Sequence, residues 1–206
     1  QANDAINARV APASATRLIS YGQPGGVKWT VTKEELQTAL AKYNLVSRPA
    51  FWGAAVHVKT TEDIQKLVDT AIRQGDMGHL DFHGVGGDWL AASVEFLNAA
   101  LDKLEAERSK LWITDHLSYH KYLTERNAAK ITVLASSPKQ IRLQLQATTD
   151  PKLYDQPLTL ATKVPADWQT VQVTQGTTKI SVTAVAGVVQ YDARPGPLEI
   201  TLQAGK

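Results

Sequence analysis

The stretch from Lys130 to Thr148, KITVLASSPKQIRLQLQAT, decides the fold class of the C-terminal part of the chain. Apolar and polar residues alternate along two runs, which the turn sequence SSPK separates. This alternation is typical of strands that bury one face, and the short turn predicts an antiparallel hairpin. Five similar runs follow, so we predict about seven short strands in a small antiparallel β-sandwich. Trp168, in the turn VPADW, is expected to pack between the two sheets.

The residues before about Asn127 alternate strand-like and helix-like segments instead. The clearest helix is 61–74, because its apolar residues recur with a period of 3.6 and Gly75 follows as a stop. Thr32 and Glu35 form a capping box at the start of another helix. The remaining predicted elements are a helix that contains Val94, Leu97, Leu101 and Leu104, and strands at RLIS (17–20), LVSRPAF (45–51), MGHLDFH (77–83) and KLWITD (110–115).

Strand–helix alternation with short connections predicts parallel βα units that join in the right-handed sense. Four such strands and three helices are compatible with an open doubly wound sheet or with half of a (β/α) barrel. The segment DAINARV, residues 4–10, reads as the remnant of a helix before the first strand. We therefore expect further βα units upstream of this stretch of chain.

The composition of the 206 residues excludes several classes of protein. The net charge is only +2 and the Lys and Arg residues are scattered, which argues against a nucleic-acid-binding surface. No apolar run approaches the roughly 18 residues that a membrane span needs. The absence of cysteine excludes disulfide bonds, thiolate zinc sites and cysteine nucleophiles, and it fits a secreted or periplasmic protein. The sequence opens at QANDAINARV, without Met or a signal peptide, which suggests a processed or truncated start.

Ligands of parallel α/β folds bind at the carboxyl ends of the strands, so residues that follow the predicted strands are candidates for a site. The residues in question are Tyr21, Gln23, Trp52, His57, His83, Asp88, Trp89, Asp115 and His116. Aromatic, histidine and carboxylate groups on one face are typical of a carbohydrate-binding or ester-hydrolysing site. The glycine-rich stretches QPGG and HGVGG lack the Lys-Ser/Thr of a phosphate-binding loop, and no G-x-S-x-G elbow occurs.

His83 is the candidate catalytic residue of this set. It ends a predicted strand, where an imidazole can act as a general acid or base near neutral pH. The alternative is a histidine that hydrogen-bonds to backbone in the turn between strand and helix. His79 lies on the same side of the predicted strand but at its other end, so we expect it to have a structural role.

His116 and His120 are four residues apart, and Asp115 precedes the first of them. On a helix this spacing can hold a zinc ion, with the carboxylate as a third ligand. The alternative is that Asp115 caps the helix and His120 is exposed to solvent. Trp52 and Trp89 are candidate platforms for sugar rings, although tryptophans are also frequent among the buried residues of barrels.

Several segments resemble, in their order along the chain, the C-terminal half of bacterial polysaccharide deacetylases, the NodB-homology enzymes of carbohydrate esterase family 4. They are QPGG (23–26), LDFHGVGGDWL (80–90), SVEFLNAALDKLEAERSKLWI (93–113) and DHLSYHKYLTER (115–126). The resemblance implies that residues 1–122 form part of a distorted (β/α) barrel. It also implies that residues 123–206 are a C-terminal extension, for which the alternating runs predict the β-sandwich.

Members of this family remove N- or O-acetyl groups with one divalent metal ion, usually zinc, which an Asp and two His hold. The resemblance implies that His83 is the histidine that acts as the acid late in the barrel. The resemblance of SYGQPGG to a substrate-binding segment of the family makes Tyr21 and Gln23 candidates for substrate binding. The residues after the predicted strands add Trp52, Asp88 and Trp89 to these candidates. The family's early T-F-D-D and H-[ST]-x-x-H motifs are absent from this sequence, so the metal ligands are expected mainly on a missing N-terminal part.

Three hypotheses of function follow. The leading one is a secreted or periplasmic polysaccharide deacetylase of which this chain supplies the C-terminal part. Its partners would be a glycan substrate and either the missing barrel half or a second copy, because a half barrel exposes strand edges and apolar surface. The second hypothesis is a non-catalytic glycan-binding or scaffolding protein. The third is a stand-alone hydrolase that uses His83, Asp88 and Asp115 without metal.

Overall fold

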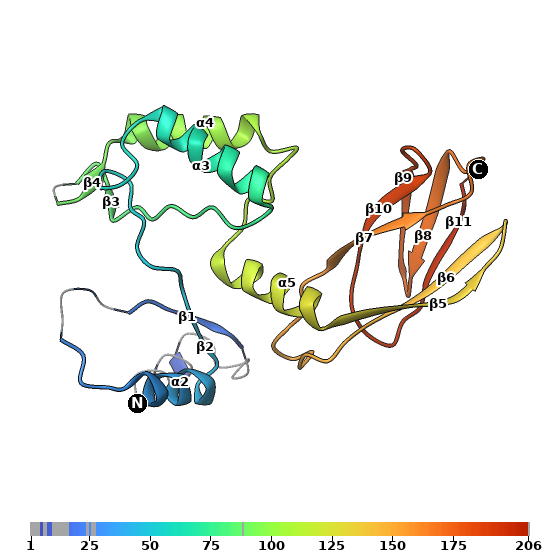
Figure 1. Ribbon diagram of the computed structural model, residues 1–206, viewed down its shortest axis with the longest axis horizontal. Helices are drawn as coiled ribbons and strands as arrows, with labels where there is room; N and C mark the ends of the chain where they lie inside the picture. The colour runs from blue at the N-terminus through green and yellow to red at the C-terminus, as the bar shows by residue number, and fades with distance from the viewer. Residues whose placement is uncertain are drawn as a thin grey trace. The chain divides into compact units, whose positions relative to one another are not determined.

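The computed structural model describes residues 5, 8–9, 17–23, 25, 28–87 and 89–205. Within these residues the fold is mixed α/β, with four helices and an antiparallel sheet of five strands, and it contains no closed barrel (Figure 1). Contacts divide the chain into two compact units. The α/β unit comprises Tyr21–Gly25 and Ser47–His116, and the other unit contains Leu117–Lys206 with the described residues that precede Tyr21 and with 28–46. None of the described helices is both long and apolar enough to cross a membrane.

The predicted antiparallel β structure after residue 127 is confirmed. Five strands form one sheet in the order β5-β6-β11-β8-β9, and two form a second sheet, β7 with β10. All of their pairings are antiparallel. The bounds are β5 Ala129–Ser136, β6 Gln140–Ala147, β7 Leu158–Lys163, β8 Thr170–Gln175, β9 Thr178–Thr183, β10 Val188–Ala193 and β11 Ile200–Ala204.

Both β-sheets contribute to one apolar core. Alternate residues of β6, β8 and β11 from the large sheet, and of β7 and β10 from the small one, are buried together. Leu145, Val171 and Ile200 are inaccessible to solvent. Trp168 belongs to the same core, and its indole N–H donates to the Pro138 carbonyl at 3.1 Å. The expectation that Trp168 packs in the interior is therefore confirmed.

Helix α5, His116–Ala128, runs directly into β5 (Figure 1). Its Glu125 is 2% exposed, and one carboxylate oxygen accepts the Gln156 N–H at 2.8 Å. One turn earlier, Lys121 pairs with Asp155 at 2.7 Å. The Asp155 carbonyl in turn accepts a bond from the Arg194 guanidinium at 2.6 Å. These contacts attach the helix to the 150–157 connection of the β structure.

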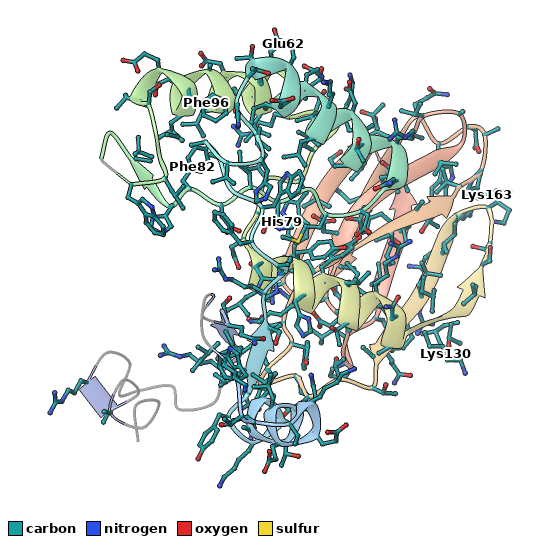
Figure 2. All side chains as sticks on the ribbon, turned by 60° about the vertical axis from the view of Figure 1, so that its left-hand side comes forward. Glu62, His79, Phe82, Phe96, Lys130 and Lys163 are labelled. Carbon is teal, nitrogen blue, oxygen red and sulfur yellow. The ribbon has the colours of Figure 1, made fainter. Side chains whose placement is uncertain are left out.

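The α/β unit is built on two helices, α3 (Thr61–Gln74) and α4 (Val94–Ala106). Gly75 ends α3 in the left-handed conformation, with φ of 63°, so the predicted helix 61–74 and its stop are confirmed. Apolar residues of the two helices form a core with the extended segment that contains Phe82. The rings of Phe82 and Phe96 lie 6.4 Å apart in this core (Figure 2).

The remaining elements are short. Strand β1 (Ile19–Tyr21) pairs with β2 (Leu45–Ser47), and α2 (Lys33–Lys42) lies between them in sequence. The capping box predicted at the start of α2 is present. Strands β3 (Gly84–Val85) and β4 (Ala91–Ala92) have two residues each and pair in parallel.

Three of the predicted strands are wrong or shortened. Segment 45–51 is a strand only as far as Ser47, because Pro49 has no N–H to donate to a neighbour. Segment 77–83 contains a single bridge, between Asp81 and Gly53, because the partner chain turns away after Gly53. Segment 110–115 is not a strand either, and its Trp112 and Ile113 are half exposed. A parallel strand must be covered on both faces, and no neighbouring element covers these two side chains completely.

Candidate functional site

Most of the predicted site residues lie in the α/β unit. The residues of this unit are Tyr21, Gln23, Trp52, His57, His83, Trp89, Asp115 and His116. His120 belongs to the other unit, and Asp88 lies outside the described residues. Four of these residues form two pairs of aromatic rings in contact, each with one histidine and one tryptophan.

The first pair is His83 with Trp89. His83 directly precedes β3, and Trp89 lies in the connection that leads to β4. Parallel pairing of Gly84 with Ala91 closes this connection, and Gly86 turns the backbone at a φ of 67°. The two rings therefore meet edge to face, with centroids 4.7 Å apart and planes at 88°.

This geometry gives His83 and Trp89 complementary chemistry. Trp89 is 71% exposed, although tryptophans are highly buried on average, and His83 is exposed beside it. An exposed indole face can bind the apolar face of a sugar ring, and an imidazole can donate a proton to a departing oxygen or nitrogen. The arrangement thus combines a surface for a sugar ring with a proton donor.

The second pair is Trp52 with His57. Their rings are stacked, with centroids 4.4 Å apart and planes only 13° from parallel. The Gly53 N–H donates to His57 Nδ1 at 3.1 Å, so neutral His57 carries its proton on Nε2. Trp52 remains 43% exposed. Trp52 is therefore not a buried barrel residue, and its role as a platform for a sugar ring remains a prediction.

Sequence reasoning missed the carboxylate that supports this second pair. Asp81 accepts from Arg48 Nη1 at 3.1 Å and from the Trp52 N–H at 3.4 Å. Its backbone also bonds to the Trp52 carbonyl at 2.9 Å and to the Ala54 N–H at 2.8 Å. Arg48 and Asp81 are 33 positions apart in the sequence, so no local spacing predicts this pairing.

Tyr21 and Gly22 lie next to Arg48, and Gln23 follows them in the chain. The Tyr21 carbonyl accepts the Arg48 N–H at 2.9 Å. Gly22 leaves room for the Arg48 guanidinium, since a Cβ at this position would lie 2.6 Å from Arg48 Nε. These contacts place the predicted substrate-binding segment beside the Arg48–Asp81 pair, although nothing in them assigns a ligand to Tyr21 or Gln23.

The two remaining histidines of the α/β unit differ in their surroundings. His79 bonds through Nε2 to the Ala50 carbonyl at 2.9 Å, which is the structural role expected of it (Figure 2). His116 begins α5 and is half buried. Burial lowers the pKa of His116, and the positive charge of Arg48 adds to this effect, whereas Asp115 and a backbone bond at Ser47 oppose it. The net shift favours the neutral imidazole.

The zinc hypothesis for Asp115, His116 and His120 finds no support in the geometry. Among the residues that the structure describes, no three His, Asp or Glu side chains come together in a way that could hold a metal ion. His120 is half buried rather than exposed, because its ring lies 6.1 Å from that of Tyr154. The expectation of a solvent-exposed His120 is therefore wrong.

Comparisons with known proteins do not assign the chain to a family. No protein-family model and no curated protein matches the sequence. Among solved structures, the chain is weakly similar to a glycoside hydrolase family 44 endoglucanase from Clostridium acetobutylium ATCC 824, with 9% identity and a TM-score of 0.24. The match covers 84% of this chain and 35% of the endoglucanase, so this chain spans about a third of that length. A TM-score this low carries no argument about fold or function.

Proposed function

We propose that this chain is the C-terminal part of a metal-dependent polysaccharide deacetylase, with His83 as the proton donor and exposed tryptophans as sugar contacts. The observation that carries the proposal is the contact between His83 and Trp89. It places an imidazole in contact with an indole that is 71% exposed. The resemblance of LDFHGVGGDWL to the deacetylases gives this pair its proposed reaction.

The chain's own residues would act on the leaving group. A sugar ring bound on Trp89 would bring its acetylated nitrogen or oxygen toward His83, which would donate a proton as the bond to the acetyl carbon breaks. The metal ion would polarise the acetyl carbonyl and activate water. Because no described group of residues fits a metal ion, its ligands would lie on an upstream part that completes a (β/α) barrel. Secretion or a periplasmic location would give such an enzyme access to polysaccharide.

Acetate release tests this proposal. The protein with its native upstream sequence and zinc is incubated with acetylated chitin and xylan oligosaccharides, beside the variant His83→Gln. We expect a loss of about 10²–10⁴ in kcat without a comparable loss of oligosaccharide binding, because only proton transfer is removed. Acetate release that is absent from the protein, or unchanged in His83→Gln, would contradict the proposal.

Zinc binding by the 206-residue chain alone is a second part of the same test. We expect no stoichiometric zinc, since the described residues hold no suitable group. Micromolar zinc affinity that is lost in His116→Ala would instead assign the metal to Asp115, His116 and His120.

A non-catalytic glycan-binding protein is the competing proposal. The exposed Trp52, whose ring stacks on His57, favours it. Tryptophan fluorescence titration with chitin, xylan and peptidoglycan oligomers separates the two. Binding without acetate release, in protein that carries the upstream sequence, would favour the binding protein.

A further inference from the structure

The aromatic cluster around Trp52 is held in place by contacts to backbone and by a charge pair. Gly53 is its pivot, because its N–H donates to His57 Nδ1 and a Cβ there would overlap the Phe51 ring. The Phe51 ring meets the same imidazole edge to face at 5.9 Å. The His57 ring therefore contacts both the Trp52 ring and the Phe51 ring, and Gly53 lies next to all three in the chain or in space.

Asp81 fixes this cluster to the rest of the α/β unit. Its backbone forms two bonds to the segment 52–54, one on each side of Gly53. Its carboxylate accepts from the Trp52 N–H and from Arg48 Nη1, so three hydrogen bonds of Asp81 hold the segment 52–54 and a fourth joins Asp81 to Arg48. Asp81 is only 29% exposed in its side chain, and the loss of its charge would leave Arg48 without this partner.

The surface that results has a defined chemical character. One face of the Trp52 indole is covered by the nearly parallel His57 ring, yet 43% of the residue remains exposed. The Asp81 carboxylate, which accepts from the Trp52 N–H, forms an ion pair with Arg48, so these two charges compensate each other. An indole whose orientation is fixed before binding suits a flat, uncharged, apolar face, since a preorganised side chain loses little entropy when a ligand binds.

We propose that Asp81 is a positioning residue that holds the Trp52–His57 stack as a preformed contact for a neutral pyranose ring, apart from the His83–Trp89 pair. The choice of a sugar rests on the proposed function, whereas the positioning role rests on the four bonds. The free face of the Trp52 indole binds the apolar face of the sugar ring, and His57 stacks on the opposite face of the indole. Asp81 sets the orientation of this stack.

Binding of chitotetraose and xylotetraose to the 206-residue chain tests this inference, with ¹⁹F-labelled tryptophan as the reporter. The five tryptophan signals are assigned by single Trp→Phe changes. We expect oligosaccharide to shift the Trp52 signal of the unsubstituted chain, and we expect Trp52→Ala, which lacks this signal, to bind the oligosaccharide more weakly by isothermal titration calorimetry. Asp81→Asn should weaken binding by about three- to tenfold, because the indole must then be ordered by the ligand.

The control for Asp81→Asn is Asp102→Asn, the same chemical change at an exposed position of α4. It should leave both affinity and the Trp52 signal unchanged. A purely structural role of Asp81 would disturb the signals of Trp89 and Trp112 in the same unit, whereas a positioning role moves the Trp52 signal alone. Arg48→Lys keeps a positive charge beside Asp81 and should restore most of the affinity that Arg48→Ala loses.

Three results would overturn the inference: unchanged binding in Trp52→Ala, unchanged binding in folded Asp81→Asn, or equal disturbance of all tryptophans in the α/β unit. The readout does not depend on acetate release. Oligosaccharide binding that needs Trp52 and Asp81, in a protein that releases no acetate, would therefore sustain the inference while the deacetylase proposal fails. Acetate release from a protein whose oligosaccharide binding does not need Trp52 would sustain the deacetylase proposal and overturn the inference.

Discussion

Glu125 is the buried acidic residue on which the attachment of α5 depends. Its carboxylate is 2% exposed and accepts the Gln156 N–H. Burial raises the pKa of Glu125 and is the largest influence on it, and the negative charge of Asp155 acts in the same direction. The Gln156 bond and the positive charges of Lys121 and Arg194 oppose this rise without cancelling it.

The raised pKa predicts how stability depends on pH. The folded state holds the Glu125 proton more tightly than the unfolded state, whose pKa is near the ordinary 4.5. As pH rises from 4.5 through the raised folded pKa, the unfolded state ionises first, so the free energy of unfolding falls. We expect Glu125→Gln to remove this fall.

Chemical denaturation of both proteins between pH 4 and pH 7 provides the measurement. Burying the glutamine amide changes the free energy of unfolding of Glu125→Gln by the same amount at every pH. The comparison therefore uses only how the free energy of unfolding of each protein changes with pH. A stability difference between the two proteins that does not change with pH would show that the carboxyl group titrates normally in the folded state.

At the level of elements, strands β5 and β6 show that alternation alone does not determine burial. Ile131 of β5 pairs directly with Leu145 of β6, and Val133 pairs with Leu143, so each pair shares one face of the sheet. Leu145 and Leu143 are buried, whereas Ile131 is 53% and Val133 is 61% exposed. β5 lies at the edge of the five-stranded sheet, where the core no longer covers its inner face.

A matched pair of substitutions tests this difference between the two strands. Leu145→Ala should lower the free energy of unfolding by about 2–5 kcal/mol, because it leaves a cavity in a close-packed core. Ile131→Ala, directly opposite on the neighbouring strand, should cost about 1 kcal/mol or less. Urea denaturation measures both, and equal costs would mean that Ile131 is covered in solution.

The sequence correctly predicted the elements that carry a strong local signal. It failed for segments that become strands only when a partner strand lies beside them. The capping box at Thr32, the period of 61–74 and the seven alternating runs each contain their own signal, and each element formed. Segments 77–83 and 110–115 look equally strand-like, but a strand needs a neighbour along its length. In segment 77–83, only Asp81 forms the bridge, and its hydrogen bonds go to the short Trp52 segment, which does not continue as a neighbouring strand.

At the scale of the whole molecule, the β structure has a core of its own. The buried residues of this core all lie between Ile141 and Leu202, and Tyr122 of α5 packs against them. The connection at residues 150–157 adds the bonds of Glu125 and Lys121 to this attachment. The predicted domain boundary, between residues 122 and 123, falls inside α5 and remains a prediction.

Two fragments test the contribution of α5. We expect residues 117–206 and 129–206 both to show β-type circular dichroism and cooperative unfolding, because both keep the core. The shorter fragment should melt lower, by about 4–8 °C for each kcal/mol of lost contact, since Tyr122 and the two charged side chains are gone. Identical melting temperatures would mean that α5 does not stabilise the β structure.

The sequence by itself determined the classes of local structure: helices with period 3.6 before residue 127, and antiparallel strands with period two after it. It also singled out His83, Trp52 and Trp89 as residues of chemical interest, through their types and neighbours. Only the tertiary structure decided that each of these tryptophans contacts a histidine and stays exposed, and that Asp81 holds one of them. The physical reason is that periodicity reports which side chains share a face of a regular helix or strand. It does not report how the irregular turns 52–57 and 83–89 bring two rings together, nor how the chain folds back so that Asp81 bonds to a residue 29 positions away.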